Sequence, residues 1–241
     1  MEKNLQPKFV ETANWGDFLD AMISLHQNAG VGRLACVSGP AGYGKTEAVI
    51  HFHAGNTGRE KIDSIYLRAL MVWTPRAFLN DLCRKLGRRD NHSTAAAAHH
   101  DAVDALTESP RIVFIDEIEK LRYEFMETVR DLADAAGAAV VLVGEETLRG
   151  YMKSAGRVRS RTLESVEFQP MSGEDLYTLA RDGAGATLSE ETMAVFLTAA
   201  KGEFRSAARD LKVALRIAAA RKSSTITPEI AKAACKAGLR N

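Results

Sequence analysis

The chain has 241 residues, of which 46% are hydrophobic and 26% are charged, and its formal net charge is +1. This composition excludes a wholly disordered protein, and the length suits one large α/β domain, alone or with a small companion domain. No apolar run reaches the roughly 18 residues that a membrane helix needs, so we expect no membrane span.

Hydrophobic periodicity and turn residues predict alternating strands and helices as far as residue 168. The predicted strands are 34–37, 64–70, 112–115, 138–143 and 166–168. The predicted helices are 15–28, one beginning at 45–46, 75–86 after an N-cap at Thr74, 93–106 with Ser93 as its cap, and 121–136. A loop with three arginines leads to the last strand. This alternation is typical of a parallel sheet that is covered by helices on both faces.

After Pro170 the strand signals disappear and three or four helices remain, with N-caps at Ser172, Ser189 and Thr227. We therefore predict two domains, an α/β domain at 1–169 and a small helical lid at 170–241. Residues 201–241 hold ten lysines and arginines against three acids. This excess favours either a polyanionic partner or simply a solvated basic helix face.

The cysteines and the N-terminal residues indicate a cytoplasmic protein. Residues 1–7 lack the apolar stretch of a signal peptide. Cys36, Cys83 and Cys235 are far apart and odd in number, which favours free thiols in a reducing compartment. The six histidines show no metal-ligand spacing with cysteines or acids.

A phosphate-binding loop follows the first predicted strand and precedes a predicted helix. Its sequence satisfies the pattern G-x-x-x-x-G-K-[ST], and its predicted ATP-contacting residues are Gly39, Pro40, Ala41, Gly42, Tyr43, Gly44, Lys45, Thr46 and Glu47. Backbone N–H groups would surround the β-phosphate, the Lys45 ammonium would reach the β- and γ-phosphates, and the Thr46 hydroxyl would bind Mg²⁺. The alternative, a chance glycine-rich turn, does not explain this context.

A second motif is the apolar strand 112–115, which ends in Asp116 and Glu117. Open α/β sheets bind ligands at the carboxyl ends of their strands. We expect Asp116 to hold the Mg²⁺ shell and Glu117 to orient or deprotonate the attacking water, with Lys45 as a further catalytic group. The alternative is a pair of carboxylates that only caps the next helix.

Together these motifs resemble the P-loop NTPases of the AAA+ class, and the chain resembles the B subunit of Mu-type transposing phages, an ATPase that selects and delivers target DNA. The segments that carry the resemblance are 9–12, 44–48, 115–117, 141–144, 160–161, 204–205 and the final helix after Thr227. The resemblance implies Mg²⁺-dependent ATP hydrolysis, homo-oligomers on double-stranded DNA as a filament or ring, stimulation of a transposase, and a location in the cytoplasm of a bacterial host.

The resemblance also implies roles for further residues. Arg161 matches the arginine finger that acts on a neighbouring subunit, with Arg157 and Arg159 as alternates and a salt-bridged surface loop as the competing interpretation. Arg205 matches the sensor 2 arginine, or begins a basic stripe on its helix. The segment implied to line the adenine pocket contains Phe9, Val10 and Thr12. Gly144 and Glu145 occupy the sensor 1 region, and no sensor 1 residue is assigned.

Members of the phage family can carry an N-terminal DNA-binding domain, and we expect none before the ATPase motifs of this chain. We therefore expect DNA contacts from the ATPase core or the lid. In ring- and filament-forming relatives the loops after the second strand and the next helix face the channel, which implies phosphate contacts by Arg68, Arg76, Arg88 and Arg89. An ordinary solvated face is the alternative. Two other functions stay open: a helicase-loader or secretion-associated ATPase, and a nucleotide-gated scaffold without catalysis.

Overall fold

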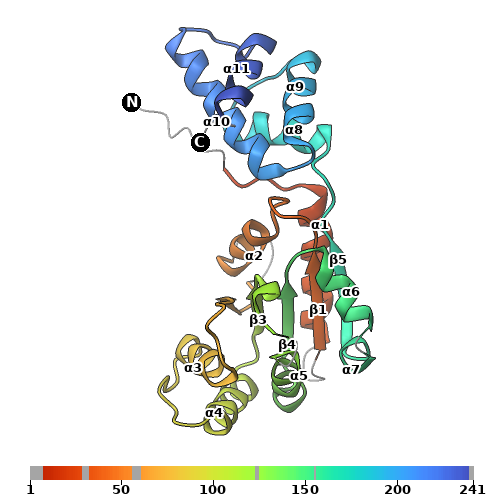
Figure 1. The fold of residues 1–241 in the computed structure, drawn as a ribbon, viewed down its shortest axis with the longest axis vertical. Coiled ribbons are helices and arrows are strands. Elements are labelled where there is room, and N and C mark those ends of the chain that lie inside the picture. The colour runs from red at the N-terminus through yellow and green to blue at the C-terminus, as the bar shows by residue number, and fades with distance from the viewer. Residues whose placement is uncertain (1–7, 29–32, 56–60, 123–124, 155, 239–241) are drawn as a thin grey trace. The chain divides into compact units, whose positions relative to one another are not determined.

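The computed structural model describes residues 8–28, 33–55, 61–122, 125–154 and 156–238 (Figure 1). These residues form two compact units. One unit contains Asp17–Pro40 and Lys45–Glu167, and the other contains Met1–Gly16, Ala41–Gly44 and Phe168–Asn241. Residues 1–7, on which the expectation about a signal peptide rests, lie outside the described residues. The division into domains at 169/170 stays a prediction.

The first unit is built on a parallel sheet with the strand order β2-β3-β4-β1-β5. The strands in the described residues are β1 (Arg33–Ser38), β2 (Ser64–Arg68), β3 (Ile112–Asp116), β4 (Ala139–Val143) and β5 (Thr162–Glu167). The register pairs Leu67 with Ile115 and Ile115 with Leu142. Because β1 and β3 lie on either side of β4, the loops that follow them leave the same edge of the sheet. The predicted α/β fold with a parallel sheet is confirmed.

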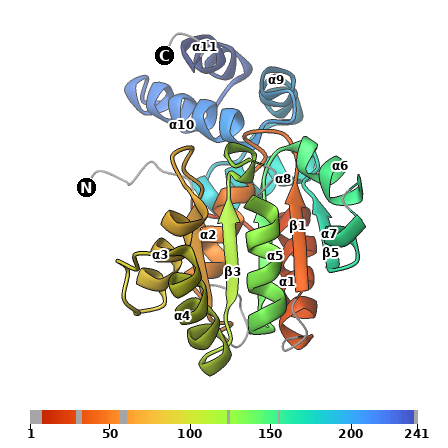
Figure 2. The ribbon, with the colours of Figure 1, turned by 60° about the horizontal axis from the view of Figure 1, so that its bottom comes forward.

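Helices cover both faces of the sheet, as Figure 2 shows for α5 in front of the strands and α1 behind them. The helices of this unit are α1 (Ala13–Gln27), which belongs to it from Asp17 on, α2 (Lys45–His53), α3 (Pro75–Lys85), α4 (Ala95–Glu108), the 3₁₀ turn η1 (Ile118–Lys120), α5 (Phe125–Ala136), α6 (Glu146–Ser154) and α7 (Gly156–Arg159). Strand β3 is buried along its whole length, and its side chains alternate between the two layers. Phe114 packs against Phe18 and Phe52 from α1 and α2, at ring-centroid distances of 6.2 and 5.5 Å. Val113 and Ile115 belong to the opposite core, with α3, α4 and α5.

Several predicted boundaries were wrong. Helix α4 is capped by Thr94 rather than Ser93, because the Thr94 hydroxyl accepts from Ala97 N at 3.2 Å. The Ser93 carbonyl instead accepts a hydrogen bond from Arg76. Helix α5 begins at Phe125 and not at residue 121, since the turn η1 comes first.

The predicted arginine loop was also wrong in its local structure. Two helices, α6 and α7, occupy residues 146–154 and 156–159, so Arg157 and Arg159 lie on a helix. Strand β5 begins at Thr162, four residues earlier than predicted. Among the described strands it pairs only with β1, so it lies at the edge of the sheet. Most of its residues are not buried, and its sequence therefore lacks the apolar run on which the strand prediction depended.

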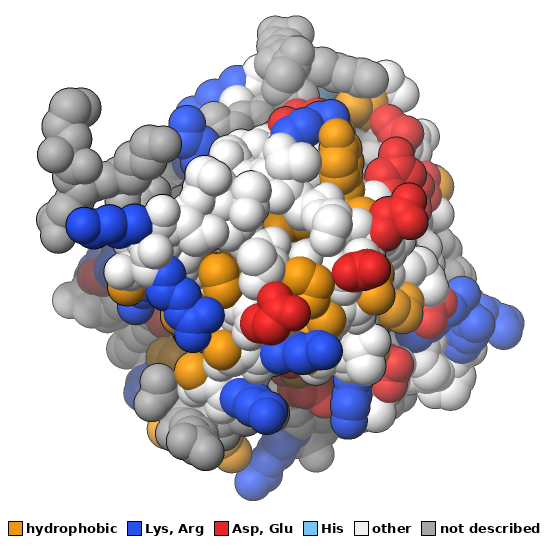
Figure 3. Space-filling view, turned by 90° about the horizontal axis from the view of Figure 1, so that it is seen from above, with side chains coloured by type: hydrophobic (Ala, Val, Ile, Leu, Met, Phe, Trp, Pro, Cys, Tyr) orange, Lys and Arg blue, Asp and Glu red, His pale blue; other side chains and the backbone are white. Residues whose placement is uncertain are grey.

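The second unit is helical. Its elements are α8 (Gly173–Thr178), the π-helical turn η2 (Leu179–Gly183), α9 (Glu190–Ala200), α10 (Phe204–Ala220) and α11 (Pro228–Gly238). The predicted caps Ser172 and Ser189 accept from Asp175 N and Thr192 N. A core of its own is formed by residues such as Leu176, Phe196 and Leu211. On the face shown in Figure 3, acidic side chains gather mainly at the upper right, whereas lysine and arginine side chains lie mainly on the left and along the bottom.

Candidate nucleotide site

The phosphate loop connects β1 to α2, as the sequence predicts. Gly42 and Gly44 have φ values of +82° and +96°, a region that L side chains rarely adopt, so the turn needs glycine at both positions. Helix α2 begins at Lys45. The Lys45 ammonium donates to the carbonyl oxygens of Gly39 at 2.6 Å and Pro40 at 2.8 Å. The Lys45 ammonium is therefore fixed beside the first two residues of the predicted phosphate-binding loop.

Asp116 lies at the carboxyl end of β3 and is only 2% exposed. Its Oδ2 accepts hydrogen bonds from the Thr46 hydroxyl at 2.8 Å and from the Tyr66 hydroxyl at 3.0 Å. Its Oδ1 accepts from the backbone N–H of Glu117 at 2.8 Å. The two motifs, 70 residues apart in the sequence, thus meet at one buried carboxylate.

Tyr66 on β2 was not predicted as a site residue. Burial, and then the negative charge of Asp116, raise the pKa of its hydroxyl well above the ordinary range. The hydroxyl therefore stays protonated and can act only as a donor toward Asp116 at neutral pH. The register, which sets Tyr66 beside Phe114, brings this side chain near the end of β3. A single sequence contains no signal for such a pairing.

Glu117 has an unusual backbone and a tightly held side chain. Its φ and ψ are +57° and +41°, the left-handed region that costs a non-glycine residue energy. Its carboxylate accepts two hydrogen bonds from Arg68, from Nε at 2.7 Å and Nη2 at 2.5 Å, and a further one from Lys120. The Arg68 hydrogen bonds, supported by Lys120, lower the pKa of Glu117 to about 2. Arg68, predicted as a DNA contact, is thus engaged by the predicted catalytic acid.

The segment implied to contact adenine packs within the helical unit. Lys8 N donates to the Gly183 carbonyl at 3.0 Å, and Val10 is buried in the core of that unit. The Thr12 hydroxyl accepts from Trp15 N at 3.3 Å, so it caps α1. Phe9 makes an edge-to-face contact with Trp15 at 5.2 Å. A role of these residues in binding adenine stays a prediction.

Residues 41–44 of the loop belong to the same unit as α10. The backbone N–H of Arg205 donates to the Gly42 carbonyl at 3.0 Å. Within this unit, the first turn of α10 and the phosphate loop are therefore neighbours. Arg205, the candidate sensor 2 residue, is the second residue of α10 and lies next to the loop.

Gly144, which follows β4, is closely covered by the turn η1. A Cβ at this position would lie 2.8 Å from Glu119 Oε2 and from Ile118 Cγ2. That separation is too short, so a side chain here would require the Glu119 and Ile118 side chains to shift. The backbone N–H of Gly144 donates to the Val37 carbonyl at 3.0 Å. Glu145 is exposed at the start of α6.

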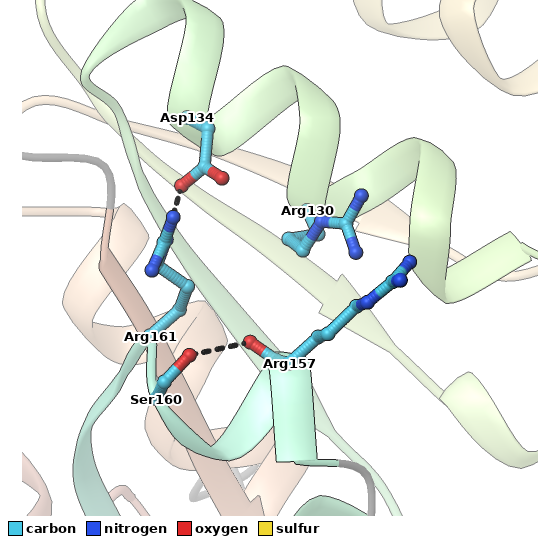
Figure 4. Close-up of a pocket in the computed structure, with 5 residues that line it drawn as sticks. All are labelled: Arg130, Asp134, Arg157, Ser160 and Arg161. Atoms are coloured by element: carbon cyan, nitrogen blue, oxygen red, sulfur yellow. Dashed lines mark hydrogen bonds and ion pairs between the residues drawn. The ribbon is translucent and has the colours of Figure 1, made fainter.

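Three arginines line an open pocket of about 270 Å³ in the sheet unit (Figure 4). Its lining residues are Arg130, Asp134, Arg157, Ser160 and Arg161. The predicted finger, Arg161, donates from Nε to Asp134 Oδ1 at 2.7 Å. Arg130 from α5 is paired with Glu127 and Asp131. Arg157 extends toward Arg130 in Figure 4, and its guanidinium makes no ion pair with a described residue.

The other arginines predicted to contact DNA hold the connector between α3 and α4. Arg76 Nη1 donates to the Ser93 carbonyl at 2.9 Å, and Arg89 Nε donates to Asn91 Oδ1 at 2.6 Å. Arg88 forms ion pairs with Asp101, at 3.9 Å, and with Glu108. Arg89 is exposed, whereas Arg88 and its partners form a partly buried group. Contacts of these side chains with phosphates stay predictions.

The residues around Asp116 fit a Mg²⁺ ion. Mg²⁺ prefers oxygen ligands, usually one or two from the protein with the rest from water and phosphates. The Thr46 hydroxyl, near the start of α2, and a buried carboxylate oxygen of Asp116 are 2.8 Å apart. Both oxygens could serve as ligands of Mg²⁺. The nearby Lys45 ammonium would compensate phosphate charge.

The sheet order, the glycine-rich loop before α2 and the buried carboxylate on β3 define a P-loop NTPase. The sequence profile of the family described as "AAA domain" matches residues 29–152, more than half of the chain. The chain belongs to this family.

Comparison with known proteins supports the AAA+ class. The chain is 24% identical over 196 residues to Mu-like prophage FluMu DNA transposition protein B of Haemophilus influenzae, covering 78% of this chain and 66% of that protein, slightly less than two thirds of its length. It is also similar to two solved structures from Aeropyrum pernix. ORC2 in its ADPNP–ADP complexes has a TM-score of 0.74 at 16% identity, covering 98% of this chain and 70% of ORC2. ORC1 in complex with DNA has a TM-score of 0.68 at 18% identity, covering 99% and 68%.

These findings confirm the predicted resemblance to AAA+ proteins of the Mu transposition type. The two structural comparisons support the fold alone. Two further expectations concern membranes and thiols. No helix among the described residues combines the length and the apolar character needed to cross a bilayer. The three cysteines are all free and buried.

Proposed function

We propose that this chain is a Mg²⁺-dependent ATPase that binds double-stranded DNA in its ATP state and delivers it as the target for a transposase. The observation that carries the proposal is the hydrogen bond between Thr46 and Asp116, which joins the phosphate-loop helix to the buried carboxylate of β3. The similarity to a prophage DNA transposition protein supports the choice of transposition. The Lys45 ammonium would bind the β- and γ-phosphates.

Hydrolysis would use Glu117 as the base. Thr46 and Asp116 would hold the Mg²⁺, which neutralises the charge that develops on the phosphates. Glu117 would orient the water and accept its proton while the water oxygen attacks the γ-phosphorus and the bond to the β–γ bridging oxygen breaks. A carboxylate with a pKa of about 2 is a weak base, so Glu117 must exchange Arg68 for the water before it acts.

A second subunit would complete the site. Arg161 lies in an arginine-lined pocket and is held by the exposed ion pair with Asp134, which a stronger anion can displace. A γ-phosphate of a neighbouring subunit is such an anion, and a finger of this kind accelerates hydrolysis by roughly 10³–10⁵. ATP would thereby connect subunits along DNA as a filament or ring. Hydrolysis would loosen the assembly.

DNA contact would be largely independent of sequence. Arg76 and Arg89 stand on or beside the connector between α3 and α4, and lysines and arginines that face phosphates supply such binding. Electron microscopy of the protein with duplex DNA and a non-hydrolysable ATP analogue tests the assembly. We expect DNA-bound oligomers only with nucleotide. If ATP analogue and DNA together yield no oligomers, this function is wrong.

The ATP-binding motifs also fit a second candidate, an ATPase that loads a helicase onto DNA. The two functions differ in the partner. Addition of the protein to a strand-transfer assay with its cognate transposase and duplex target should raise product formation in the presence of ATP. ATP-dependent DNA binding without any stimulation of strand transfer favours the loading function. ATPase activity without DNA binding favours a secretion-associated role.

A further inference from the structure

Three side chains of metal-ligand type meet outside the nucleotide site, between α3 and α4. The Cys83 thiol, a ring nitrogen of His92 and a carboxylate oxygen of Asp101 all lie within 4.8 Å of one another. The spacing of the histidines along the chain gives no signal for this cluster. Eight residues separate each member from the next, and the packing of α3 against α4 brings them together.

The three side chains come from three separate segments. Cys83 is on α3 and fully buried, His92 is on the connector, and Asp101 is on α4. His92 Nε2 and Asp101 Oδ2 are 2.9 Å apart. The side chains of His92 and Asp101 are 13% and 24% exposed, so the cluster is reached from solvent on their side and closed on the Cys83 side.

The cluster is supported by its surroundings. Asn80 binds the backbone of His92 twice, accepting from N at 3.0 Å and donating to O at 3.3 Å. This pair fixes the connector against α3. The Cys83 thiol donates to the Ala98 carbonyl at 3.3 Å, one turn before Asp101 on α4, and would give up this proton on binding a metal as thiolate. The two Asn80 hydrogen bonds are partners of the kind that hold the ligands of metal sites in place.

A cysteine, a histidine and an aspartate could also suggest a nucleophilic triad. The fully buried thiol argues against that chemistry, because a substrate carbonyl cannot reach Sγ without unpacking α3 from α4. A metal ion, by contrast, needs only a path for one small cation past His92 and Asp101. Burial of the sulfur is typical of structural metal sites and unfavourable for catalysis.

We propose that Cys83, His92 and Asp101 bind a Zn²⁺ ion, with water as the fourth ligand. Zn²⁺ accepts thiolate, imidazole and carboxylate ligands in tetrahedral geometry. The corresponding bond lengths place ligand atoms about 3.5 Å from one another, so the longest separation has to shorten by at most about 1.3 Å, whereas His92 Nε2 and Asp101 Oδ2, now 2.9 Å apart, have to move slightly apart. Side-chain rotation at His92 and Asp101 supplies such a movement.

The local charges are compatible with a divalent cation. A Cys83 thiolate and the Asp101 carboxylate balance the two charges of Zn²⁺. Arg88 lies 3.9 Å from Asp101, and its positive charge is balanced by its ion pair with Glu108. The ion would tie α3, the connector and α4 together. It would thereby fix the segment that carries Arg88 and Arg89. A role of this segment in DNA binding rests on the proposed function, but the metal site does not.

Cobalt is the probe, because a thiolate bound to Co²⁺ gives an intense near-ultraviolet charge-transfer band. The full-length protein is treated with a chelator, desalted and titrated with Co²⁺ without Mg²⁺ or nucleotide. We expect one equivalent to bind with this band and Zn²⁺ to displace it. Cys83→Ser should abolish the band, and His92→Gln and Asp101→Asn should each weaken Co²⁺ binding by at least about tenfold. Cys235→Ser, which changes another buried cysteine, and His100→Gln are matched controls that should keep it.

Circular dichroism melts establish that each variant is folded. If Cys83→Ser unfolds, His92→Gln decides, because its partly exposed side chain can be replaced with little loss of packing. Absence of the band in the folded wild type, or its persistence in folded Cys83→Ser, would overturn the proposal. A Lys45→Ala variant should bind Co²⁺ like the wild type, so the result is independent of the nucleotide site.

Discussion

Arg68 on β2 and Glu117 after β3 form a two-pronged ion pair, with the Arg68 Nε and Nη2 atoms 2.7 and 2.5 Å from the two carboxylate oxygens. The register of the sheet sets Arg68 beside Asp116, so the guanidinium reaches the next residue on the neighbouring strand. The proposed base is therefore held by an arginine.

Replacement of Arg68 should release this base. In Arg68→Ala we expect the basal rate of ATP turnover to rise by about tenfold. The pKa of Glu117 should rise from about 2 toward its ordinary 4.5. Because the base acts when deprotonated, the acid limb of kcat/KM should move to higher pH. Steady-state kinetics between pH 4 and 7 measure both effects.

Arg76→Ala is the matched control for Arg68→Ala, since Arg76 hydrogen-bonds to Ser93 and not to Glu117. It should leave the pH profile unchanged. An unchanged profile in folded Arg68→Ala would show that the ion pair does not govern the base. The same pair implies that Glu117 contributes stability above pH 4.5 and that this contribution is lost as pH falls toward 2.

Lys45 should be essential for nucleotide affinity. Its ammonium is already aimed over the loop by the carbonyls of Gly39 and Pro40. Removal of a charge-assisted phosphate contact costs on the order of 1.5–3 kcal/mol, so Lys45→Ala should weaken ATP binding by roughly 10–100-fold and ATP-dependent DNA binding with it. Titration calorimetry with Mg²⁺·ATP measures the loss. Wild-type affinity in this variant would remove the phosphate assignment, whereas the exposed Lys61→Ala should bind normally.

The main elements of the sheet unit followed from local patterns. Four apolar residues before Asp116 predicted β3, and Thr74 with Pro75 predicted the start of α3, because both signals act within a few residues. Side-chain contacts between neighbouring strands could not be predicted from such local patterns. Tyr66 reaches Asp116 and Arg68 reaches Glu117 only because β2 lies beside β3 in a particular register. The same holds for the Cys83 cluster, which depends on helix packing.

The finger assignment can be tested by mixing two inactive proteins. Glu117→Gln keeps Arg161 but lacks the base, and Arg161→Ala keeps the base but lacks the finger. Each alone should hydrolyse ATP at least about 100-fold more slowly than wild type while binding it. Equimolar mixtures should regain turnover, because a Glu117→Gln subunit supplies Arg161 to its neighbour. Turnover is measured with DNA present at a fixed total protein concentration.

Recovery in the mixture distinguishes action between subunits from a structural effect on the pocket. If the mixture stays as inactive as its components, Arg161 does not act across an interface. Arg157→Ala and Arg159→Ala in place of Arg161→Ala identify which arginine acts. A variant at Asp134, such as Asp134→Asn, frees Arg161 from its ion pair and should not reduce turnover.

Replacement of Arg88 and replacement of Arg89 should have different effects on DNA binding and on stability. Arg89 is exposed, so Arg89→Ala should reduce the slope of log affinity against log salt by about 0.9 for one lost phosphate contact. Arg88 is paired with Asp101 and Glu108, so Arg88→Ala should lower the melting temperature as well. Fluorescence anisotropy with duplex DNA at several salt concentrations, combined with thermal melts, measures both. Equal salt slopes for Arg89→Ala and wild type would exclude Arg89 as a phosphate contact.

The most direct measurement is ATP turnover and ATP affinity of Glu117→Gln beside the wild type, both with Mg²⁺ and DNA. The amide has nearly the same shape as the carboxylate but cannot accept the proton, so we predict unchanged affinity and a turnover reduced by about 10²–10⁴. Wild-type turnover in the variant would contradict the catalytic role of the acid pair. Absence of ATP binding in the wild type would contradict the nucleotide site itself.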